Sequence, residues 1–496
     1  MPGKHKLFDQ FPPVTKEEWL EKIKSDLKGE DFEKRLVWKT DEGFSVMPFY
    51  THEDTSELKH TGRFLYRKEG RWRIRQDISV TDYKESNEKA NFLVKNGVDS
   101  IGFVISDPDS ISIDNFKNLL RGINCKEVEL NFLSNGKARE IVDILTNLEF
   151  GTQPYRELLT GAVEADPLGR LMLNGTLCIP VSDGFDYLAA LVKESSPIHG
   201  LRAIQVNGSN FANAGADCVT ELAFSISMAC EYLNQLTDRG VSPDLAVRKI
   251  RFSFAAGSTY FMEIAKLRAA RIVWPAVADK FLPDNQAGQS MIIHSVTSRW
   301  NKTLFDPYVN LIRTQAEAMA AVLGGADSVT VEPFDVVFRR PDEFSERLAR
   351  NQQLLLKEEA FFDKVSDPSA GSWYIENLTS LVAENAWKLF VEIEEKGGFI
   401  SALRAGTIQR MIHDEAERQK SDALSGHRHI LGTNLYPNPR ENMHPMADER
   451  ILFTRQASAA NPEVEPLRIS RLAEEMERHR LETEKLEMKS NKLKIK

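Results

Sequence analysis

The stretch Leu201-Arg202-Ala203-Ile204-Gln205-Val206-Asn207-Gly208-Ser209-Asn210-Phe211-Ala212-Asn213-Ala214-Gly215-Ala216 leads from a β-branched run towards a long apolar helix that begins near Val219. Its first part, Leu201–Asn207, predicts a strand, and the glycine-bearing part predicts a loop at the carboxyl end of that strand. An α/β barrel keeps its chemistry at the carboxyl ends of its strands. The polar side chains of this loop are those of Ser and Asn, and neither is a strong acid, base or nucleophile at neutral pH. The loop therefore lies where catalysis is expected, without the groups that would perform it.

Short apolar or β-branched runs recur on both sides of this stretch and alternate with helical periodicity. The predicted strands are Trp72–Ser79, Ser100–Ser106, Val128–Ser134, Thr160–Glu164, Leu201–Asn207, Ile250–Ala256, Met291–Val296 and Ser328–Val331. The predicted helices are Tyr83–Lys95, Ile113–Ile123, Gly136–Leu148, Phe185–Lys193, Val219–Leu236, Phe261–Phe281, Pro307–Leu323 and Glu343–Glu359. Strands that alternate with helices need crossover connections, and such connections join parallel strands.

Closing eight such units removes both sheet edges and gives an α/β fold, a (βα)8 barrel of the TIM type, here over residues 61–365. An open doubly wound sheet is the alternative that the same alternation allows. The fourth unit carries the weakest signal, because residues 166–183 show little periodicity.

Two segments flank the predicted barrel. Residues 1–60 form an N-terminal arm, in which Thr15 and Glu18 are spaced as a capping box for a helix over Lys16–Leu27. An apolar face on this helix needs cover, either from the body of the chain or from another subunit, so we expect the arm to contact a partner. Residues 366–496 form a helical linker or extension, with predicted helices at Leu378–Lys396, Phe399–Ala405, Thr407–Gln419 and Pro466–Lys496.

The composition excludes several classes of protein. A net charge of −9 and a pI near 5.7 argue against a nucleic-acid partner. The four cysteines have neither CxxC nor zinc-ligand spacing, which is typical of reduced thiols in a cytoplasmic protein. No apolar run reaches the roughly 18 residues of a membrane span, and no signal or transit peptide is evident. We also expect no metal site, because the histidines lack ligand spacing.

Three residues on the predicted strands are candidates for contacts inside the barrel. Arg251 and Ser253 alternate to one side of their strand, and a buried arginine needs an anion, either a protein carboxylate or a phosphate or thioester-bearing ligand. His294 fits either a hydrogen-bonding wall residue or a ligand contact. The helix over Phe261–Arg271 interleaves charged with small residues, which we interpret as ion pairs on a helix surface.

Four long blocks are jointly similar to one known family. They are Phe261–Arg271 (FMEIAKLRAAR), Arg313–Gly325 (RTQAEAMAAVLGG), Phe344–Gln352 (FSERLARNQ) and Asp367–Tyr374 (DPSAGSWY). Together they resemble the adenosylcobalamin-dependent acyl-CoA mutases, with the methylmalonyl-CoA mutases as the nearest match. The resemblance covers nearly the whole chain. It implies a (βα)8 barrel that encloses the CoA chain along its axis, followed by a linker to a flavodoxin-like cobalamin domain.

The resemblance also implies where active members hold their catalytic groups, and this sequence departs from that pattern. The degenerate positions are Asp77, Ser209, Asn210, Asn213 and Val336, where active members have, in order, Tyr, Tyr, His, Glu and Glu. The Arg-Asn-Thr-Tyr motif whose arginine clamps the substrate carboxylate is missing as well. Four residues fall on matching positions and are candidate remnants of a CoA site: Arg75, Arg251, Ser253 and His294.

These losses are chemically coherent. Asn210 cannot become cationic as a histidine can, and Asp77 places a negative charge in a cavity that has to bind an anionic substrate. The family's cobalt-ligating Asp-x-His-x-x-Gly motif is absent, so we expect neither a cobalamin domain nor a bound cofactor in this chain.

The resemblance therefore implies the small, non-catalytic subunit of a heterodimeric mutase that interconverts methylmalonyl-CoA and succinyl-CoA. Its partner would be a homologous large subunit that holds the adenosylcobalamin and the acyl-CoA. Two alternatives stay open. One is an active barrel for another acyl-CoA that works with a separate cobalamin protein, and the other is a CoA-ester-binding module without a mutase partner.

Overall fold

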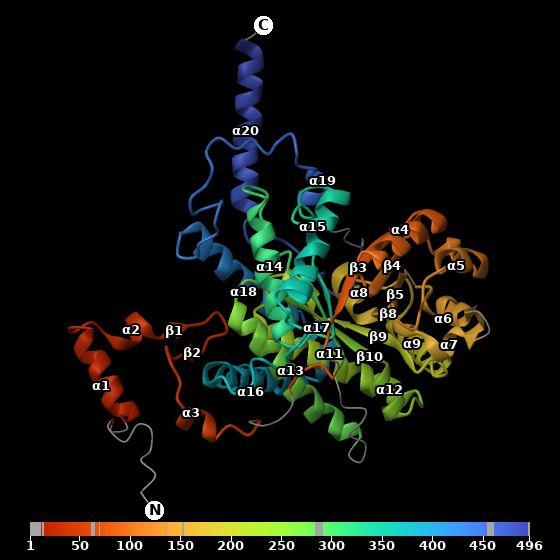
Figure 1. The fold of residues 1–496 in the computed structure, drawn as a ribbon, viewed down its shortest axis with the longest axis horizontal. Coiled ribbons are helices and arrows are strands. Elements are labelled where there is room, and N and C mark those ends of the chain that lie inside the picture. Colours follow the sequence, from red (N-terminus) through yellow and green to blue (C-terminus); the bar gives the residue numbers. More distant parts are fainter. Residues whose placement is uncertain are drawn as a thin grey trace, which may run out of the picture.

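The predicted strands close into one parallel barrel (Figure 1). The computed structural model describes residues 11, 14–60, 65–68, 70–134, 136–150, 153–282, 291–453 and 461–494. The barrel strands are β3 Arg73–Val80, β4 Ser100–Ile105, β5 Glu129–Ser134, β8 Thr160–Ala165, β9 Gly200–Asn207, β10 Ile250–Ala256, β11 Ile293–Thr297 and β12 Ser328–Thr330. Because β12 pairs with β3, with Thr330 opposite Arg75, the sheet has no free edge. This pairing confirms the (βα)8 barrel and excludes the open sheet.

Helices surround the barrel at the positions that the sequence predicts. They are α4 Tyr83–Lys95, α5 Ile113–Leu119, α6 Ala138–Asn147, α9 Val181–Glu194, α11 Cys218–Asp238, α13 Tyr260–Phe281, α14 Val309–Leu323 and α15 Glu343–Leu354, which continues as a π-helix over Leu355–Glu359. Shorter elements fill the connections: η1 Pro108–Ser110, the hairpin β6 Glu149–Phe150 and β7 Gln153–Pro154, α7 Tyr155–Leu158, α8 Pro167–Asn174 and α12 Pro243–Lys249. Helix α8 occupies the part of the fourth unit in which the sequence shows little periodicity.

Residues 209–213, predicted as part of a loop, form the short helix α10 (Ser209–Asn213). Phe211 anchors it, because this side chain is fully buried and packs edge-on against Phe224 at a ring-centroid distance of 5.7 Å. The chain enters α10 through Gly208, where a Cβ would lie 3.0 Å from the backbone oxygen of Ser253. A glycine is therefore required by this close approach. The helical turn follows from tertiary packing, which local turn residues do not reveal.

Helix α13 is buried, so its interpretation as an ion-pairing surface helix is wrong. Lys266 and Arg268 are 0% and 1% exposed. Lys266 pairs with Glu221 of α11 and Glu263, and Arg268 pairs with Asp367 and Glu376. The physical reason is a second helical layer, in which α16 (Trp373–Glu395) packs over α11 and α13. The charges in this sequence block therefore hold helices together.

The N-terminal arm consists of α1 Lys16–Asp26, α2 Phe32–Leu36, the hairpin β1 Trp38–Lys39 and β2 Ser45–Val46, and α3 His52–Ser56. The predicted capping box is present, with Thr15 and Glu18 bonded to each other's backbone N–H groups. No residue of α1 is buried, and Figure 1 shows this helix projecting away from the barrel. At the far end of the arm, His60 Nε2 lies 2.9 Å from Glu376 Oε2 of α16.

The C-terminal extension contains α16, α17 Gly398–Arg404, α18 Thr407–Leu424, α19 Glu449–Leu452 and α20 Glu474–Lys494. The prediction of a helix from Pro466 is wrong for its first turns, because residues 466–473 run along the barrel. There, the backbone N–H groups of Leu467 and Leu472 donate to the carbonyls of Met172 and Trp300, both at 2.8 Å. Within the described ranges, no helix combines the length and the apolar character needed to cross a bilayer.

Candidate functional site

Strand β10 sends an arginine into the barrel. Its phenylalanines face the helices, as the contact of Phe252 with Trp274 at 4.9 Å records, so Arg251 points to the opposite side. There the guanidinium donates to Gln205 Oε1 of β9 at 2.9 Å and to Asn131 of β5, and it pairs with Glu164 of β8. Arg251 is 1% exposed. The side chain thus spans the barrel axis and satisfies its charge on a protein carboxylate.

A second arginine joins the same carboxylate from the other side. Arg75 Nη1 of β3 lies 2.8 Å from Glu164 Oε1, and Arg75 Nε donates to Asp77 Oδ1 at 2.7 Å. Burial alone would raise the pKa of Glu164, but the charges of Arg75 and Arg251 outweigh it and lower that pKa. Two guanidinium charges thus face two carboxylate charges. We call Arg75, Asp77, Glu164 and Arg251 the axial ion network.

His294 lies in the barrel wall near this network. Its Nδ1 lies 2.9 Å from Ser328 Oγ and its Nε2 lies 3.4 Å from Thr330 Oγ1. Burial lowers the pKa of His294 well below its ordinary value, so the ring is neutral at physiological pH. Both ring nitrogens therefore have hydroxyl neighbours from β12, and Ser253 lies in the same interior at 6% exposure.

The polar residues of α10 make contacts within the protein. Ser209 Oγ donates to Asn207 Oδ1 at 2.6 Å, and Asn210 is 9% exposed. Asn213 Oδ1 accepts from the backbone N–H of Arg299 at 2.9 Å, and its carbonyl accepts from the N–H of Ser470 at 3.3 Å. Asn213 thus links α10, the loop after β11 and the C-terminal extension, which is a structural arrangement.

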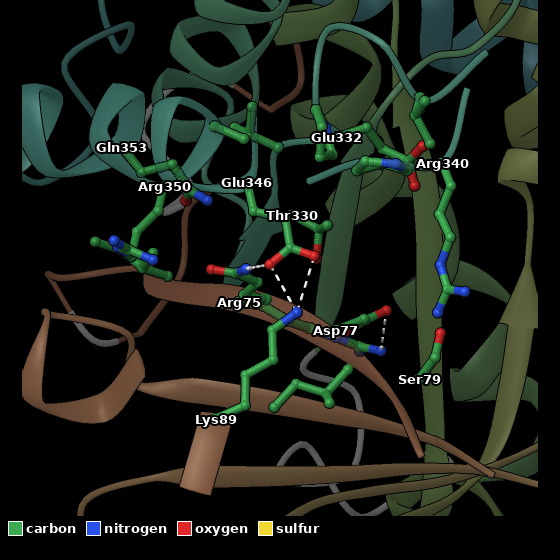
Figure 2. A pocket seen from close by; sticks show the side chains of 18 of the residues that line it. Arg75, Asp77, Ser79, Lys89, Thr330, Glu332, Arg340, Glu346, Arg350 and Gln353 are labelled. Atoms are coloured by element: carbon green, nitrogen blue, oxygen red, sulfur yellow. Dashed lines mark hydrogen bonds and ion pairs between the residues drawn. The ribbon is translucent and has the colours of Figure 1, made fainter. Parts of the chain in front are cut away.

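A cavity of about 390 Å³ opens at the carboxyl ends of β3 and β12, between α4 and α15 (Figure 2). Of the residues singled out from the sequence, it is lined by Arg75, Asp77 and Val336. It is not lined by Ser209, Asn210, Asn213, Arg251, Ser253 or His294. The predicted site residues are therefore divided among the barrel axis, this cavity and α10.

The sequence analysis missed Asn131, Glu164 and Gln205, which complete the contacts across the axis. A signal for them exists, because each is a polar residue inside a strand that is otherwise largely apolar. Such a residue has to find a partner inside the barrel. Its partners come from other strands, however, and only the strand register places them together.

Comparison with known proteins identifies the family of this barrel. The profile of the methylmalonyl-CoA mutases matches residues 39–493. The chain belongs to this family. The methylmalonyl-CoA mutase small subunit of Porphyromonas gingivalis is 41% identical over 97% of this chain and 79% of its own length. The small subunit of Streptomyces virginiae is 32% identical over 91% of this chain and 74% of its own. The mitochondrial methylmalonyl-CoA mutase of Mus musculus is 31% identical over 88% of this chain, which spans 63% of that protein's length.

The two positions that the resemblance places on the cofactor side carry no carboxylate in this methylmalonyl-CoA mutase family member. At the two positions where the resemblance implies a glutamate facing the cofactor, Asn213 is engaged by the backbone and Val336 packs against an apolar cluster around Phe334 and Phe338. These two positions therefore do not supply the acidic side chains that the resemblance implies for the cofactor side.

Proposed function

We propose that this chain is the non-catalytic small subunit of a two-subunit methylmalonyl-CoA mutase. The similarity to two proteins named small subunit supports the subunit assignment. The single observation that carries the absence of catalysis is the pairing of Glu164 and Asp77 with Arg75 and Arg251, because it engages the two arginines that fall on matching positions of the CoA site of active members. Asp77 and Glu164 neutralise both arginines, so this network leaves no positive charge for an anionic substrate.

Opening the axis would be energetically costly. A CoA chain on the axis has to displace contacts of Arg251, whose guanidinium reaches β5, β8 and β9. Breaking a buried ion pair by removing one partner costs about 3–5 kcal/mol. Substrate binding would have to supply this free energy before any reaction. The network therefore argues against an active barrel for another acyl-CoA and against a CoA-ester-binding module.

In the proposed enzyme, the large subunit binds the acyl-CoA and the adenosylcobalamin, and this chain supplies a folded surface for it. The arm is the proposed contact. Trp19 of α1 is 47% exposed, and its ring contacts Phe49 of the same arm at a ring-centroid distance of 4.1 Å. Val14, which precedes the helix, is 71% exposed. A partner that covers these side chains would bury apolar surface that this chain leaves in water.

We also place the assembled enzyme in the cytoplasm. All four cysteines are free thiols, and Cys125, Cys218 and Cys230 are buried. Free thiols agree with a reducing compartment.

The test is turnover of the purified chain, alone and together with its large subunit, in the presence of added adenosylcobalamin and methylmalonyl-CoA. We expect turnover only when the large subunit is present. A variant of the small subunit with Glu157→Gln, an exposed substitution far from the network, is the matched control for handling and should behave as the parent does. Turnover by the lone small subunit would contradict the proposal.

A further inference from the structure

A second cavity lies between α18 and the non-helical residues 465–470, which we call the C-terminal strap. Its volume is about 100 Å³. It is lined by one side of α18, by the strap and by Ala214, and by no residue of a barrel strand. None of the degenerate positions and no member of the axial ion network lines it. The cavity is therefore separate from the site that the family resemblance implies.

Hydrogen bonds fix the two sides of this cavity relative to each other. The backbone N–H of Leu467 in the strap donates to the carbonyl of Met172 at 2.8 Å, which holds the strap against α8. From α18, Gln409 Nε2 donates to the carbonyl of Glu465 at 2.9 Å. The cavity is thus enclosed by two elements that are bonded to the body of the chain and to each other.

The buried part of the cavity contains an acceptor without a donor. Gln409 is 5% exposed, and its Oε1 is buried with no hydrogen-bond partner in the described part of the chain. Its Nε2 donates to two carbonyls, those of Glu465 and Leu403, so exchanging the nitrogen and the oxygen of the amide would only create two repulsive contacts. A buried amide oxygen that makes no hydrogen bond is costly. A ligand at this end of the cavity therefore has to donate.

The rim of the cavity supplies one free charge of each sign. Glu465 and Arg468 of the strap are exposed and line the cavity, and neither side chain forms a hydrogen bond or ion pair with another described residue. The other two charged residues of the lining, Glu417 and Lys420, pair with each other at 3.0 Å. A free carboxylate and a free guanidinium at one rim fit a ligand that carries both a cation and an anion.

The size of the cavity limits the ligand to a few heavy atoms. A volume of about 100 Å³ has room for several water molecules. It lies well below the roughly 300 Å³ at which sites for drug-sized molecules begin. Ile412, Ala416 and Leu467 are buried and add apolar surface to the wall. The ligand that fits is short, with a small apolar part beside its charges.

We propose that this cavity binds a small amino acid as a zwitterion, with its ammonium group on Gln409 Oε1 and Glu465 and its carboxylate on Arg468. The ammonium group supplies the donor that Gln409 lacks, and the planar guanidinium of Arg468 matches a carboxylate. The short carbon chain lies against Ile412 and Leu467. Because the ligand contacts α18 and the strap together, its binding strengthens the docking of the C-terminal extension.

The test is calorimetric titration of the full chain without its partner, so the result does not depend on the proposed subunit role. The probes are glycine, L-alanine, β-alanine and γ-aminobutyrate, with ethylamine and propionate as probes that carry only one of the two charges. We expect at least one amino acid to bind about 10-fold or more tightly than both single-charge probes, the effect of one charge-assisted contact. The melting temperature should rise with the concentration of that amino acid.

The variants separate the three contacts. Glu465→Gln and Arg468→Gln each remove one charge at the exposed rim and should each weaken binding of the best amino acid about 10-fold. Gln409→Met removes the buried acceptor and should weaken binding as well. Arg410→Gln, at an exposed position of α18 outside the cavity, is the matched control and should have no effect. If Gln409→Met does not fold, as its melting curve would show, the two rim variants decide the result.

Three outcomes would overturn the proposal. The first is the absence of binding by every amino acid, which would leave the cavity to water. The second is binding of ethylamine or propionate as tight as that of the best amino acid. The third is an affinity that Glu465→Gln or Arg468→Gln leaves unchanged. Unchanged affinity in a folded Gln409→Met variant would contradict the role of the buried acceptor.

Discussion

At the scale of single residues, Glu164 is the centre of the axial ion network, because it faces both Arg75 and Arg251. Glu164→Gln leaves two buried guanidinium groups with one carboxylate fewer between them. We expect the free energy of unfolding to fall by about 3 kcal/mol, as for other broken buried pairs. Thermal melting followed by circular dichroism checks this, with the exposed Glu157→Gln as control.

The axial ion network also predicts that a second substitution restores part of the stability lost in Glu164→Gln. Glu164→Gln combined with Arg251→Met removes a carboxylate and the arginine that it serves, so fewer unpaired charges remain in the barrel. The double variant should therefore melt above the single Glu164→Gln variant. Equal or lower stability of the double variant would mean that Arg251 is held mainly by Gln205 and Asn131.

The sequence predicts part of this site for a physical reason. Alternation along β10 puts Arg251 and Ser253 on the inner face, and the need of a buried arginine for an anion follows from electrostatics. The sequence leaves open whether that anion is a protein group or a ligand. The answer depends on the position of Glu164 two strands away around the barrel, which pairing and stagger determine and local sequence does not.

At the scale of elements, the β1–β2 hairpin should dock on the body in a pH-dependent way. Burial and the neighbouring Asp217 raise the pKa of Glu42, in the hairpin turn, to about 7. Burial and Asp217 also raise the pKa of Glu415 of α18, to about 10. Arg418 and Arg428 reach the hairpin through Asp41 and do not neutralise this carboxyl cluster fully. When the hairpin is docked, the Glu42 carboxyl group therefore keeps a proton that it releases when the hairpin is undocked.

Whether docking strengthens or weakens as the pH rises follows from the two pKa values of Glu42. An undocked Glu42 has its ordinary pKa of 4.5, and the docked residue has a pKa of about 7. Docking is thus fully favoured below pH 4.5 and weakens as the pH rises towards 7. Hydrogen exchange of residues 38–46, corrected for the intrinsic rate, should lose up to about 10-fold protection per pH unit in this window. Glu42→Gln should remove the dependence and Glu33→Gln, at an exposed site, should keep it; a pH dependence that survives Glu42→Gln would assign it to another group.

The arm gives a second prediction at this scale. Removing residues 1–36 deletes α1 and α2, whose residues are not buried, and leaves the hairpin and His60 in place. We expect the melting temperature of the isolated chain to stay within about 2 °C, because little buried surface is lost. Association with the large subunit should weaken at least about 10-fold. Analytical ultracentrifugation of the mixture checks this, with Trp19→Ala as a milder variant; unchanged association would place the interface elsewhere.

At the scale of the whole molecule, the barrel could be predicted because each strand is marked by its own short apolar or β-branched run. Eight such strands that alternate with helices are the number that closes a (βα)8 barrel. The packing of α16 over α13 could not be predicted in this way. In the sequence, Lys266 and Arg268 have the charges of surface residues, yet both are buried in the structure. Their partners Glu221, Asp367 and Glu376 lie 45, 99 and 108 positions away along the chain. The recognised blocks around Arg268 and Asp367 are thus two sides of one structural contact, and they carry the fold of the family without carrying its chemistry.

The last prediction concerns the revival of catalysis in the whole barrel. A variant that restores the expected residues, with Asp77→Tyr, Ser209→Tyr, Asn210→His and Asn213→Glu, should still show no turnover with adenosylcobalamin and methylmalonyl-CoA. The reason is that Glu164 would still hold Arg75 and Arg251, the two arginines that fall on matching positions of the CoA site. Binding of a CoA ester, measured by calorimetry, should first become detectable when Glu164→Ser is added and the two arginines are released. Detectable binding before that step would show that this pairing does not prevent CoA binding, and the loss of activity would then lie in the four restored positions alone.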